Sequence, residues 1–282
     1  MRNWIKDKYI ILTGASSGIG RELCKILIHK YEANVIGVGR NEGKMLSLAQ
    51  ELGEHKEKFS YRLFDVCDAN AWREFKAFLE VEKINPILLI NNAGAFPTFQ
   101  KALRTTQSTY EWIMQTNYFS VLHAVELISP ILQGEGKHLP AIVNVSSSAS
   151  LCTIAGTSAY SASKAALRSY TEALQMEEKG RMYVGLICPG TTATELFSRD
   201  EHTKNSALDI IAMPASKMAK KIARKILKKK KRAVLGWDAK FMNWTAKIAP
   251  VKGISLISWV MKTSKSKVFS EVYGYQKDNE NK

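Results

Sequence analysis

Cysteine is scarce in this chain of 282 residues, and its few positions suggest no structural use of sulfur. The cysteines form no C-x-x-C pair and stand near no histidine cluster, which argues against a metal site. Their wide separation gives no sign of a disulfide framework, so we expect no metal and a reducing, cytoplasmic setting. The four positions are Cys24, Cys67, Cys152 and Cys188.

Long apolar runs are missing too. The apolar run near the N-terminus is too short and too interrupted for a secretory signal, and it leads directly into a glycine-rich turn. The C-terminal stretch 238–267 falls short of the ~18 to 20 uninterrupted apolar residues that span a bilayer. We therefore expect neither a cleaved leader nor a membrane-spanning helix.

Acidic residues are nearly absent from one region of the chain. Residues 217–267 hold 16 lysines and arginines and a single acid, Asp238, which accounts for the net charge of +15. The remaining residues carry 25 basic and 25 acidic side chains and are neutral overall. Any attraction to an anionic partner therefore belongs to the C-terminal region.

Continuously apolar, β-branched runs alternate with segments of helical period through the first 190 residues. Such runs are typical of strands that are covered on both faces by helices. The alternation predicts an α/β fold, a Rossmann-type, doubly wound parallel sheet of about seven strands with helices on both faces. The expected strands include 9–14, 34–39, 87–94, 141–147 and 184–190, and the expected helices include 19–31, 68–83, 107–133 and 159–179.

The pattern loosens after residue 190. Residues 195–212 mix polar and apolar side chains and predict an irregular flap. Pro214 is expected to open a helix whose apolar positions recur at helical spacing over 217–232, and a last strand is expected at 233–237.

The first predicted strand ends in a glycine-rich sequence, TGASSGIG, at residues 13–20. The backbone N–H groups of such a turn, and of the helix that follows it, point to one place, where a pyrophosphate binds. A tight turn alone is a weak signal, but its position at the first strand-to-helix junction favours a dinucleotide site. The expected contacts are Gly14, Ser16, Ser17, Gly18, Ile19 and Gly20.

The second predicted strand ends at Arg40, where an NAD-specific site of this kind would place an acid for the ribose hydroxyls. A guanidinium suits a ribose phosphate instead, with Ser16 as a helper from the glycine-rich turn. The residue therefore favours NADP(H) as the cofactor. The alternative is a solvated arginine at a strand end.

Tyr160 and Lys164 are four residues apart, so a helix would place them on one face. A free tyrosine, with a pKa of about 10, is a poor base at neutral pH unless a nearby ammonium lowers that pKa. The same spacing recurs at Tyr273 and Lys277, in a polar tail with no strand before it, where we interpret it as chance. The first pair differs because the serines 146–148 close a buried strand upstream.

These motifs, over about residues 7–195, resemble those of the short-chain dehydrogenase/reductase family in order and spacing. The resemblance implies hydride transfer between a nicotinamide and a carbonyl or alcohol carbon. Tyr160 would be the general acid in reduction and the base in oxidation, and Ser147, 13 residues earlier, would orient the carbonyl. Lys164 would lower the tyrosine pKa and bind the nicotinamide ribose. Asn117 would hold a water that relays protons to the lysine, although a structural asparagine inside a helix is the alternative.

The same resemblance assigns further strand ends to the cofactor. A pair after the third strand would lie on the adenine side, and an N-N-A-G element follows the fourth strand. A P-G-x-x-x-T element at 189–194 would bind the carboxamide and the pyrophosphate. The residues concerned are Asp65, Val66, Asn92, Ala93, Gly94, Pro189, Gly190, Thr192 and Thr194.

The expected substrate wall is apolar. The loops 95–99 and 149–154 and the flap 195–212 carry few charges, which favours a lipophilic carbonyl compound over a sugar or a small keto acid. A steroid, a long-chain keto compound or a retinoid-like aldehyde would suit it, whereas simple cover for the core is the alternative. The expected substrate contacts are Phe96, Ser147, Leu151, Ile154, Tyr160 and Phe197.

The basic region has two interpretations. Aromatic and aliphatic residues stand between scattered lysines in 238–267, as in segments that lie in the interface of an anionic bilayer, so peripheral membrane contact through 217–267 is one expectation. The tail also resembles the C-terminal extensions of family members that act on lipids and steroids. A helical lid over the cleft is the other interpretation. We divide the chain into an NADP(H)-binding catalytic domain, 1–237, and a basic amphipathic extension, 238–282.

Two other functions compete with a free lipophilic substrate. A 3-oxoacyl reductase would use an acidic carrier protein that a basic surface attracts. A non-catalytic NADPH sensor or nucleic-acid-binding protein would use the lysine run 217–232, but the intact catalytic set argues against it and we expect no nucleic-acid partner. The resemblance also implies a homodimer or homotetramer formed through the helices at 107–133 and 159–179.

Overall fold

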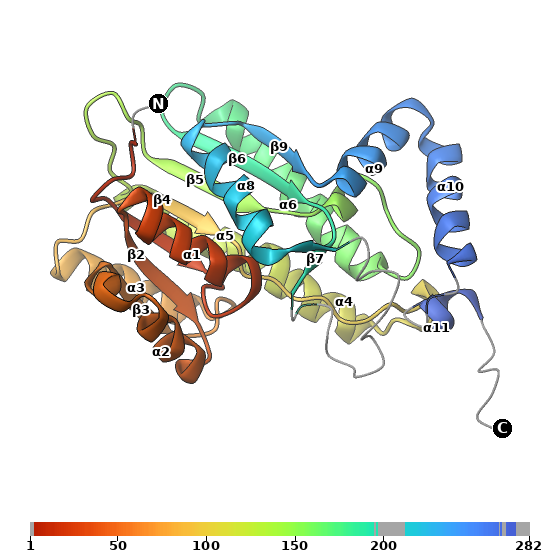
Figure 1. The fold of residues 1–282 in the computed structure, drawn as a ribbon, viewed down its shortest axis with the longest axis horizontal. Coiled ribbons are helices and arrows are strands. Elements are labelled where there is room, and N and C mark those ends of the chain that lie inside the picture. Colours follow the sequence, from red (N-terminus) through yellow and green to blue (C-terminus); the bar gives the residue numbers. More distant parts are fainter. Residues whose placement is uncertain (1–2, 195, 197–211, 265, 267–268, 275–282) are drawn as a thin grey trace.

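Seven parallel strands form the sheet of the computed structural model, which describes residues 3–194, 196, 212–264, 266 and 269–274. Their order, β3-β2-β1-β4-β5-β6-β9, reverses direction between β1 and β4, as in a doubly wound fold (Figure 1). The predicted fold class is thus confirmed. The strands are β1 (Tyr9–Thr13), β2 (Asn34–Gly39), β3 (Phe59–Leu63), β4 (Pro86–Asn91), β5 (Ala141–Val145), β6 (Tyr183–Pro189) and β9 (Arg232–Leu235).

The strand register brings the carboxyl ends of the strands to one edge of the sheet. Ile11 in β1 lies opposite Ile36 in β2 and Leu89 in β4, so the loops after these three strands begin at the same level. Ligands of open α/β sheets bind at this edge, beside the point where the strand order reverses. The predicted site residues follow these strands in the sequence.

Helices cover both faces of the sheet and bury two apolar clusters. On one face lie α1 (Gly18–Tyr31), α2 (Glu42–Glu51) and α8 (Ala215–Leu227), with α1 beside α8 (Figure 1). On the other face lie α3 (Ala69–Val81), α5 (Ser120–Ile128) and α6 (Ser158–Glu177), which bury Trp72, Val125 and Leu167.

Helix α8 begins directly after Pro214, as predicted. Its apolar residues, among them Met218, Ile222 and Ile226, are fully buried against the sheet and α1. The apolar face of this amphipathic helix therefore packs in the core, and lysines such as Lys220 and Lys221 face solvent.

The helix predicted over 107–133 is present from Gln107 to Ile131, and its division by a π-helical turn was not predicted. The segment forms α4 (Gln107–Met114), a π-helical turn (Gln115–Phe119) and α5, and it ends in a 3-10 turn (Ser129–Ile131) that contains Pro130. Within the π-helical turn the side chain of Asn117 hydrogen-bonds outside the helix, where its amide pairs with the backbone of Ala95.

The C-terminal extension is helical. It comprises α9 (Trp237–Ile248), α10 (Pro250–Thr263), which Pro250 separates from α9, and the short α11 (Ser270–Tyr273). Helix α9 begins at Trp237, the last residue of the predicted catalytic domain, and the division into domains stays a prediction. In Figure 1 these helices lie at the end of the molecule opposite α2 and α3, and α10 projects from the body.

Two features near the extension complete the fold. A short parallel pair, β7 (Thr192–Ala193) and β8 (Met213–Pro214), flanks the predicted flap 195–212, of which only Leu196 and Ala212 belong to the described residues. Within the described part of the chain, no helix is long and apolar enough to cross a membrane.

Candidate active site

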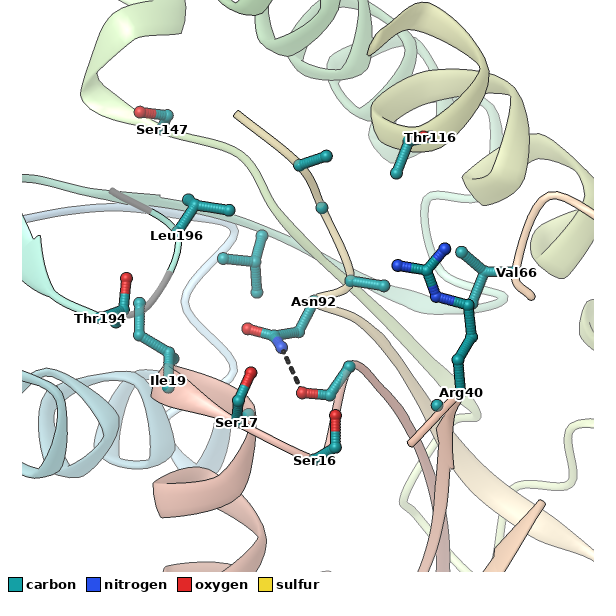
Figure 2. A pocket seen from close by; sticks show the side chains of 18 of the residues that line it. Ser16, Ser17, Ile19, Arg40, Val66, Asn92, Thr116, Ser147, Thr194 and Leu196 are labelled. Carbon is teal, nitrogen blue, oxygen red and sulfur yellow. Dashed lines mark hydrogen bonds between the residues drawn. The ribbon is translucent and has the colours of Figure 1, made fainter. Parts of the chain in front are cut away.

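A cleft of about 1110 Å³ opens at the carboxyl edge of the sheet. In Figure 2, Arg40 and Ser147 lie at opposite ends of this cleft, and Asn92 lies between them near Ser16 and Ser17. All residues predicted to contact the cofactor line this cleft, and so does Ser147. The cleft therefore brings together segments that follow six different strands.

The glycine-rich turn is shaped by close backbone approaches. Gly14 has a φ of 68°, and a Cβ there would stand 2.9 Å from the Cα of Ala93. A Cβ at Gly20 would overlap the carbonyl oxygen of Gly14. Only glycine at these positions lets α1 start against the turn, so that its first N–H groups face the cleft.

Thr13 and Asn92 connect the first and fourth strands beneath the cleft. The Thr13 hydroxyl oxygen accepts hydrogen bonds from the backbone N–H groups of Asn92 and Ala93, each at 3.0 Å. The Asn92 side chain donates in return to the carbonyl of Thr13 at 3.1 Å, and also to that of Gly14 (Figure 2). Asn92 is therefore a structural link that also lines the cleft.

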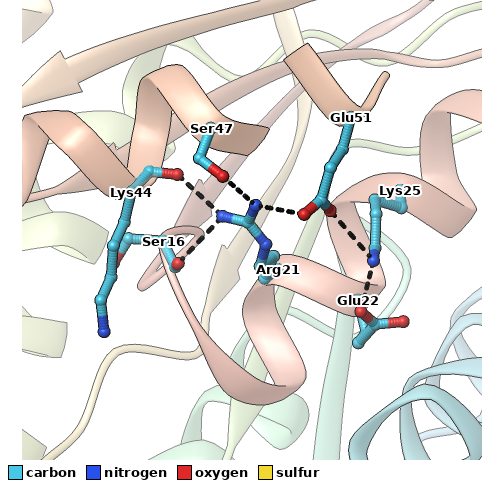
Figure 3. Close-up of polar contacts among 7 residues, drawn as sticks. All are labelled: Ser16, Arg21, Glu22, Lys25, Lys44, Ser47 and Glu51. Atoms are coloured by element: carbon cyan, nitrogen blue, oxygen red, sulfur yellow. Dashed lines mark hydrogen bonds and ion pairs between the residues drawn. The ribbon is translucent and has the colours of Figure 1, made fainter. Parts of the chain in front are cut away.

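Arg21, which sequence reasoning did not single out, holds the glycine-rich turn against α2 (Figure 3). Its guanidinium donates to the carbonyl of Lys44 at 2.8 Å and to that of Ser16 at 3.4 Å. It also pairs with the Glu51 carboxylate at 2.8 Å. Five donors in a fixed fork allow this many contacts, which a lysine would not provide.

Arg40 is exposed at the end of β2, and its guanidinium donates to the Asp65 carboxylate at 3.0 Å. Burial alone would raise the pKa of Asp65, but the backbone N–H of Cys67 and the charge of Arg40 outweigh it and lower that pKa. Lys44, in the first turn of α2, lines the same end of the cleft. This end therefore holds two cations and one carboxylate.

Tyr160 lies in the first turn of α6 and is buried, with 7% of its surface exposed. Burial raises the pKa of its phenol, and a hydrogen bond with the Ser147 hydroxyl acts in the opposite direction. Ser147 caps the short 3-10 helix Ser148–Ser150, whose Ala149 N–H donates to its hydroxyl oxygen at 3.2 Å. The predicted Ser147–Tyr160 pair is thus brought together.

Lys164 is buried one helical turn after Tyr160 and donates to the carbonyl of Val145 at 3.2 Å. Burial lowers its pKa to about 8. Its ammonium nitrogen stands 6.0 Å from the centre of the Tyr160 ring, and its charge is not among the causes that shift the tyrosine pKa. Its predicted role in lowering that pKa stays a prediction.

Asn117 does not line the cleft, but it is fully buried directly behind it. Its amide oxygen accepts from the N–H of Ala95 at 2.7 Å, and its nitrogen donates to the carbonyl of Ala95 and the hydroxyl of Ser163. A Cβ at Gly94 would lie 3.0 Å from the Asn117 oxygen and 3.3 Å from the Lys164 nitrogen. Both side chains therefore meet at one glycine, and the water-holding role predicted for Asn117 stays a prediction.

The P-G-x-x-x-T element meets the first turn of α9. The Asp238 carboxylate accepts a hydrogen bond from the N–H of Thr191 at 2.6 Å. A Cβ at Gly190 or Gly236 would overlap this carboxylate. The single acid of the basic region is therefore a structural contact to the cofactor loop, which its sequence context gave no means of predicting.

The predicted substrate residues separate into two groups. Phe96 packs edge-on against Tyr160, with ring centres 5.2 Å apart, but it is buried and does not itself line the cleft, so its contact with substrate stays a prediction. Ile154 instead packs with Met242 and Ile257 beneath α9 and α10. Leu151 and Ile154 do not line the cleft, and Phe197 lies outside the described residues.

Several cleft residues were missed by sequence reasoning. Lys44 gave no signal in the sequence, because the helix whose first turn holds it was not predicted. Five more come from α4 and the π-helical turn, on the N-terminal side of Asn117. They are Ser108, Glu111, Trp112, Gln115 and Thr116.

Comparison with known proteins gives a consistent result. Residues 8–205 match the family model described as short chain dehydrogenase. The chain is 29% identical over 257 residues to 3-ketodihydrosphingosine reductase of Bos taurus, covering 87% of this chain and 76% of that protein. It is 31% identical to a benzil reductase ((S)-benzoin forming) of Saccharomyces cerevisiae, covering 67% and 73%. A short chain dehydrogenase of Shigella flexneri, solved with NADP, superposes with a TM-score of 0.71 at 22% identity, covering 85% and 100%.

Proposed function

Because the chain belongs to the short-chain dehydrogenase family, and is therefore an oxidoreductase of carbonyl and alcohol groups, we propose that it uses NADPH to reduce a lipophilic long-chain ketone. The observation that carries this proposal is the apolar cluster packed against Tyr160. The buried Phe96 ring packs against that of Tyr160, and the Phe99 ring lies 4.9 Å from Phe96. Apolar surroundings of the reacting group favour alkyl chains and ring systems over polar substrates.

The cleft residues fit a dinucleotide. The turn at Gly14 and Gly20 leaves no room for side chains, so backbone N–H groups would hold the pyrophosphate. Arg40 and Lys44 would bind the ribose phosphate that distinguishes NADPH from NADH. When bound, the cofactor supplies the hydride.

The chain's own residues would supply the proton and the orientation. The Ser147 hydroxyl would donate a hydrogen bond to the substrate carbonyl and polarise it. The buried Tyr160 hydroxyl would give its proton to the oxygen as the alcohol forms, because a raised pKa keeps it protonated at neutral pH. Lys164, fixed by the Val145 carbonyl, would place a positive charge beside the developing phenolate.

Among lipophilic ketones, we favour a long-chain keto compound of the sphingoid type over a steroid. The support is the bovine relative, whose name specifies a 3-ketodihydrosphingosine and whose match extends over most of this chain. A ketone bound to an acidic carrier protein is the competing substrate.

The proposal also includes the surroundings of the enzyme. A cytoplasmic protein in peripheral contact with an anionic membrane through 217–267 would suit a lipophilic substrate, and the excess of basic residues there supports it. A homodimer or homotetramer through α4, α5 and α6 is supported by two exposed apolar side chains, Phe119 in the π-helical turn between α4 and α5 and Met176 in α6.

The test compares NADPH and NADH oxidation over free long-chain, steroid and small ketones and one carrier-bound ketone. We expect turnover of the long-chain ketone with NADPH, and loss of about 10² to 10⁴ in kcat for Tyr160→Phe with NADPH binding retained. Tyr170→Phe, which removes a phenol from the same helix outside the cleft, is the matched control.

Other outcomes would change the assignment. Turnover of the carrier-bound ketone alone would replace the substrate class. Tight NADPH binding without turnover of any ketone would indicate a sensor of the cofactor and contradict the proposal.

A further inference from the structure

Helix α9 presents an apolar stripe to solvent. Trp237, Phe241, Trp244 and Ile248 recur at spacings of four, three and four residues, which places them on one face. All are exposed, Trp244 by 58% and Ile248 by 65%, whereas Met242 on another face is buried. The helix therefore has one apolar face in the core and a second one uncovered.

Helix α10 has the same property. Gly253 is buried against Thr245 of α9, and Ile257 packs with Met242 and Cys152, yet Val251 is 77% exposed and Trp259 61% exposed. A helix that is apolar on opposite faces is normally covered on both. Helix α8 shows the contrast, because its apolar residues are all in the core and its exposed side is made of lysine and arginine.

The charges of this hairpin, α9 with α10, are of one sign. Lys240, Lys247, Lys252 and Lys262 are exposed on it, and no residue from 239 to 264 is acidic. A second copy of the chain docking through the same face would bring these lysines together, which opposes association. Tryptophan and lysine together are instead the residues that suit the boundary between anionic headgroups and acyl chains.

We infer that the α9–α10 hairpin docks on an anionic lipid bilayer and that the lipophilic substrate reaches Tyr160 from that side. The inference of docking depends only on the structure of the hairpin. The inference of substrate delivery depends in addition on the proposed function. This narrows the membrane contact proposed above for 217–267 to α9 and α10, because α8 has no exposed large apolar side chain to insert.

A continuous series of contacts connects the hairpin to the catalytic tyrosine. Ser258 of α10 hydrogen-bonds the Tyr273 hydroxyl of α11 at 2.9 Å. From there, aromatic rings follow one another to Tyr160, which lines the cleft, with centres 4.9 to 6.4 Å apart. The rings are those of Tyr273, Phe269, Phe99, Phe96 and Tyr160. They form a packed apolar cluster that joins the hairpin side of the molecule to Tyr160, so the reacting group has its apolar surroundings on the side from which we infer the substrate arrives.

The test of docking is sedimentation of the full chain with vesicles of phosphatidylcholine, with and without about 30% phosphatidylserine. We expect co-sedimentation with the anionic vesicles that weakens as salt is raised. Trp244→Ser combined with Trp259→Ser should weaken binding at least tenfold, and Lys247→Gln combined with Lys252→Gln about tenfold.

Matched controls separate the hairpin from the rest of the surface. Val81→Ser with Met176→Ser removes equally exposed apolar residues elsewhere, and Lys220→Gln with Lys221→Gln removes cations from α8. Both should bind vesicles as the unaltered chain does. Equal losses in the α8 and hairpin variants, or no binding by the unaltered chain, would overturn the docking. A hairpin-dependent dimer without vesicle binding would overturn it in favour of a second copy.

Substrate delivery has its own readout. For a long-chain ketone dissolved in vesicles, the hairpin variants should lose at least fivefold in kcat/KM, and for a small soluble ketone they should keep it. Equal losses with both ketones would refute delivery through the hairpin. Tyr160→Phe should lose turnover and keep vesicle binding, so failure of the proposed chemistry is distinguishable from failure of docking.

Discussion

In our proposal, Arg40 and Lys44, the cations near the end of β2, make the site prefer NADPH to NADH. Removing the guanidinium with Arg40→Ala should raise the KM for NADPH about tenfold to a hundredfold, because a charge-assisted contact to phosphate is worth about 1.5 to 3 kcal/mol. The KM for NADH should change less than twofold, and Arg104→Ala, on the surface away from the cleft, should change neither. Steady-state kinetics with both cofactors would show this, and equal increases for the two would contradict it.

Lys164 should make stability depend on pH. Its pKa in the folded chain is about 8, below its ordinary value of 10.5, because burial penalises the ammonium. Between these values the unfolded chain binds more protons, so the free energy of unfolding should rise with pH, by at most roughly 3 kcal/mol. Urea unfolding from pH 8 to 10.5 should show a rise that Lys164→Met lacks. The same slope in both proteins would contradict this assignment.

Site residues could be predicted from the sequence where they belong to a recognisable local pattern. The glycine-rich turn, Arg40 and Tyr160 follow apolar strands or share a helix face, so spacing alone brings them to the cleft. Arg21 and Asp238 were not foreseeable, because their partners are distant in the sequence and follow only from how α1, α2 and α9 pack.

The π-helical turn between α4 and α5 should depend on one side chain. Asn117→Ala would leave the N–H of Ala95 without its buried acceptor, which should lower the free energy of unfolding by about 1 to 3 kcal/mol and reduce kcat. Gln107→Ala, exposed in α4, should be neutral. Chemical unfolding with kinetics tests both; unchanged stability in Asn117→Ala would exclude a structural role for this amide.

Among the elements, strands and helices were predicted about equally well. Strands β1, β2 and β5 end within two residues of their predicted ends, because apolar runs stop at polar or glycine-rich turns, and helices α1, α3 and α6 match their predicted bounds as closely. The π-helical turn inside 107–133 was missed because it keeps a helical pattern of apolar residues. Helix α2 was not predicted at all, since it buries only Met45 and Leu48.

At the scale of the molecule, the catalytic body and the basic extension are coupled through one carboxylate. Asp238→Asn keeps the shape but removes the charge that accepts from Thr191, so the loop 189–194 should be less ordered. We expect a three- to tenfold higher KM for NADPH with little change in thermal stability. Glu54→Gln, an exposed acid elsewhere, is the control, and an unchanged KM in Asp238→Asn would show that the loop is held without it.

The contact between Asp238 and the cofactor loop also limits how this protein can be re-engineered or can diverge. A C-terminal extension without contacts to the cofactor site could be replaced without affecting nucleotide binding. Here the first turn of α9 supplies part of the loop's support, so grafting a different tail at residue 237 would alter nucleotide affinity along with targeting. We therefore expect the loop 189–194 and the first turn of α9 to coevolve.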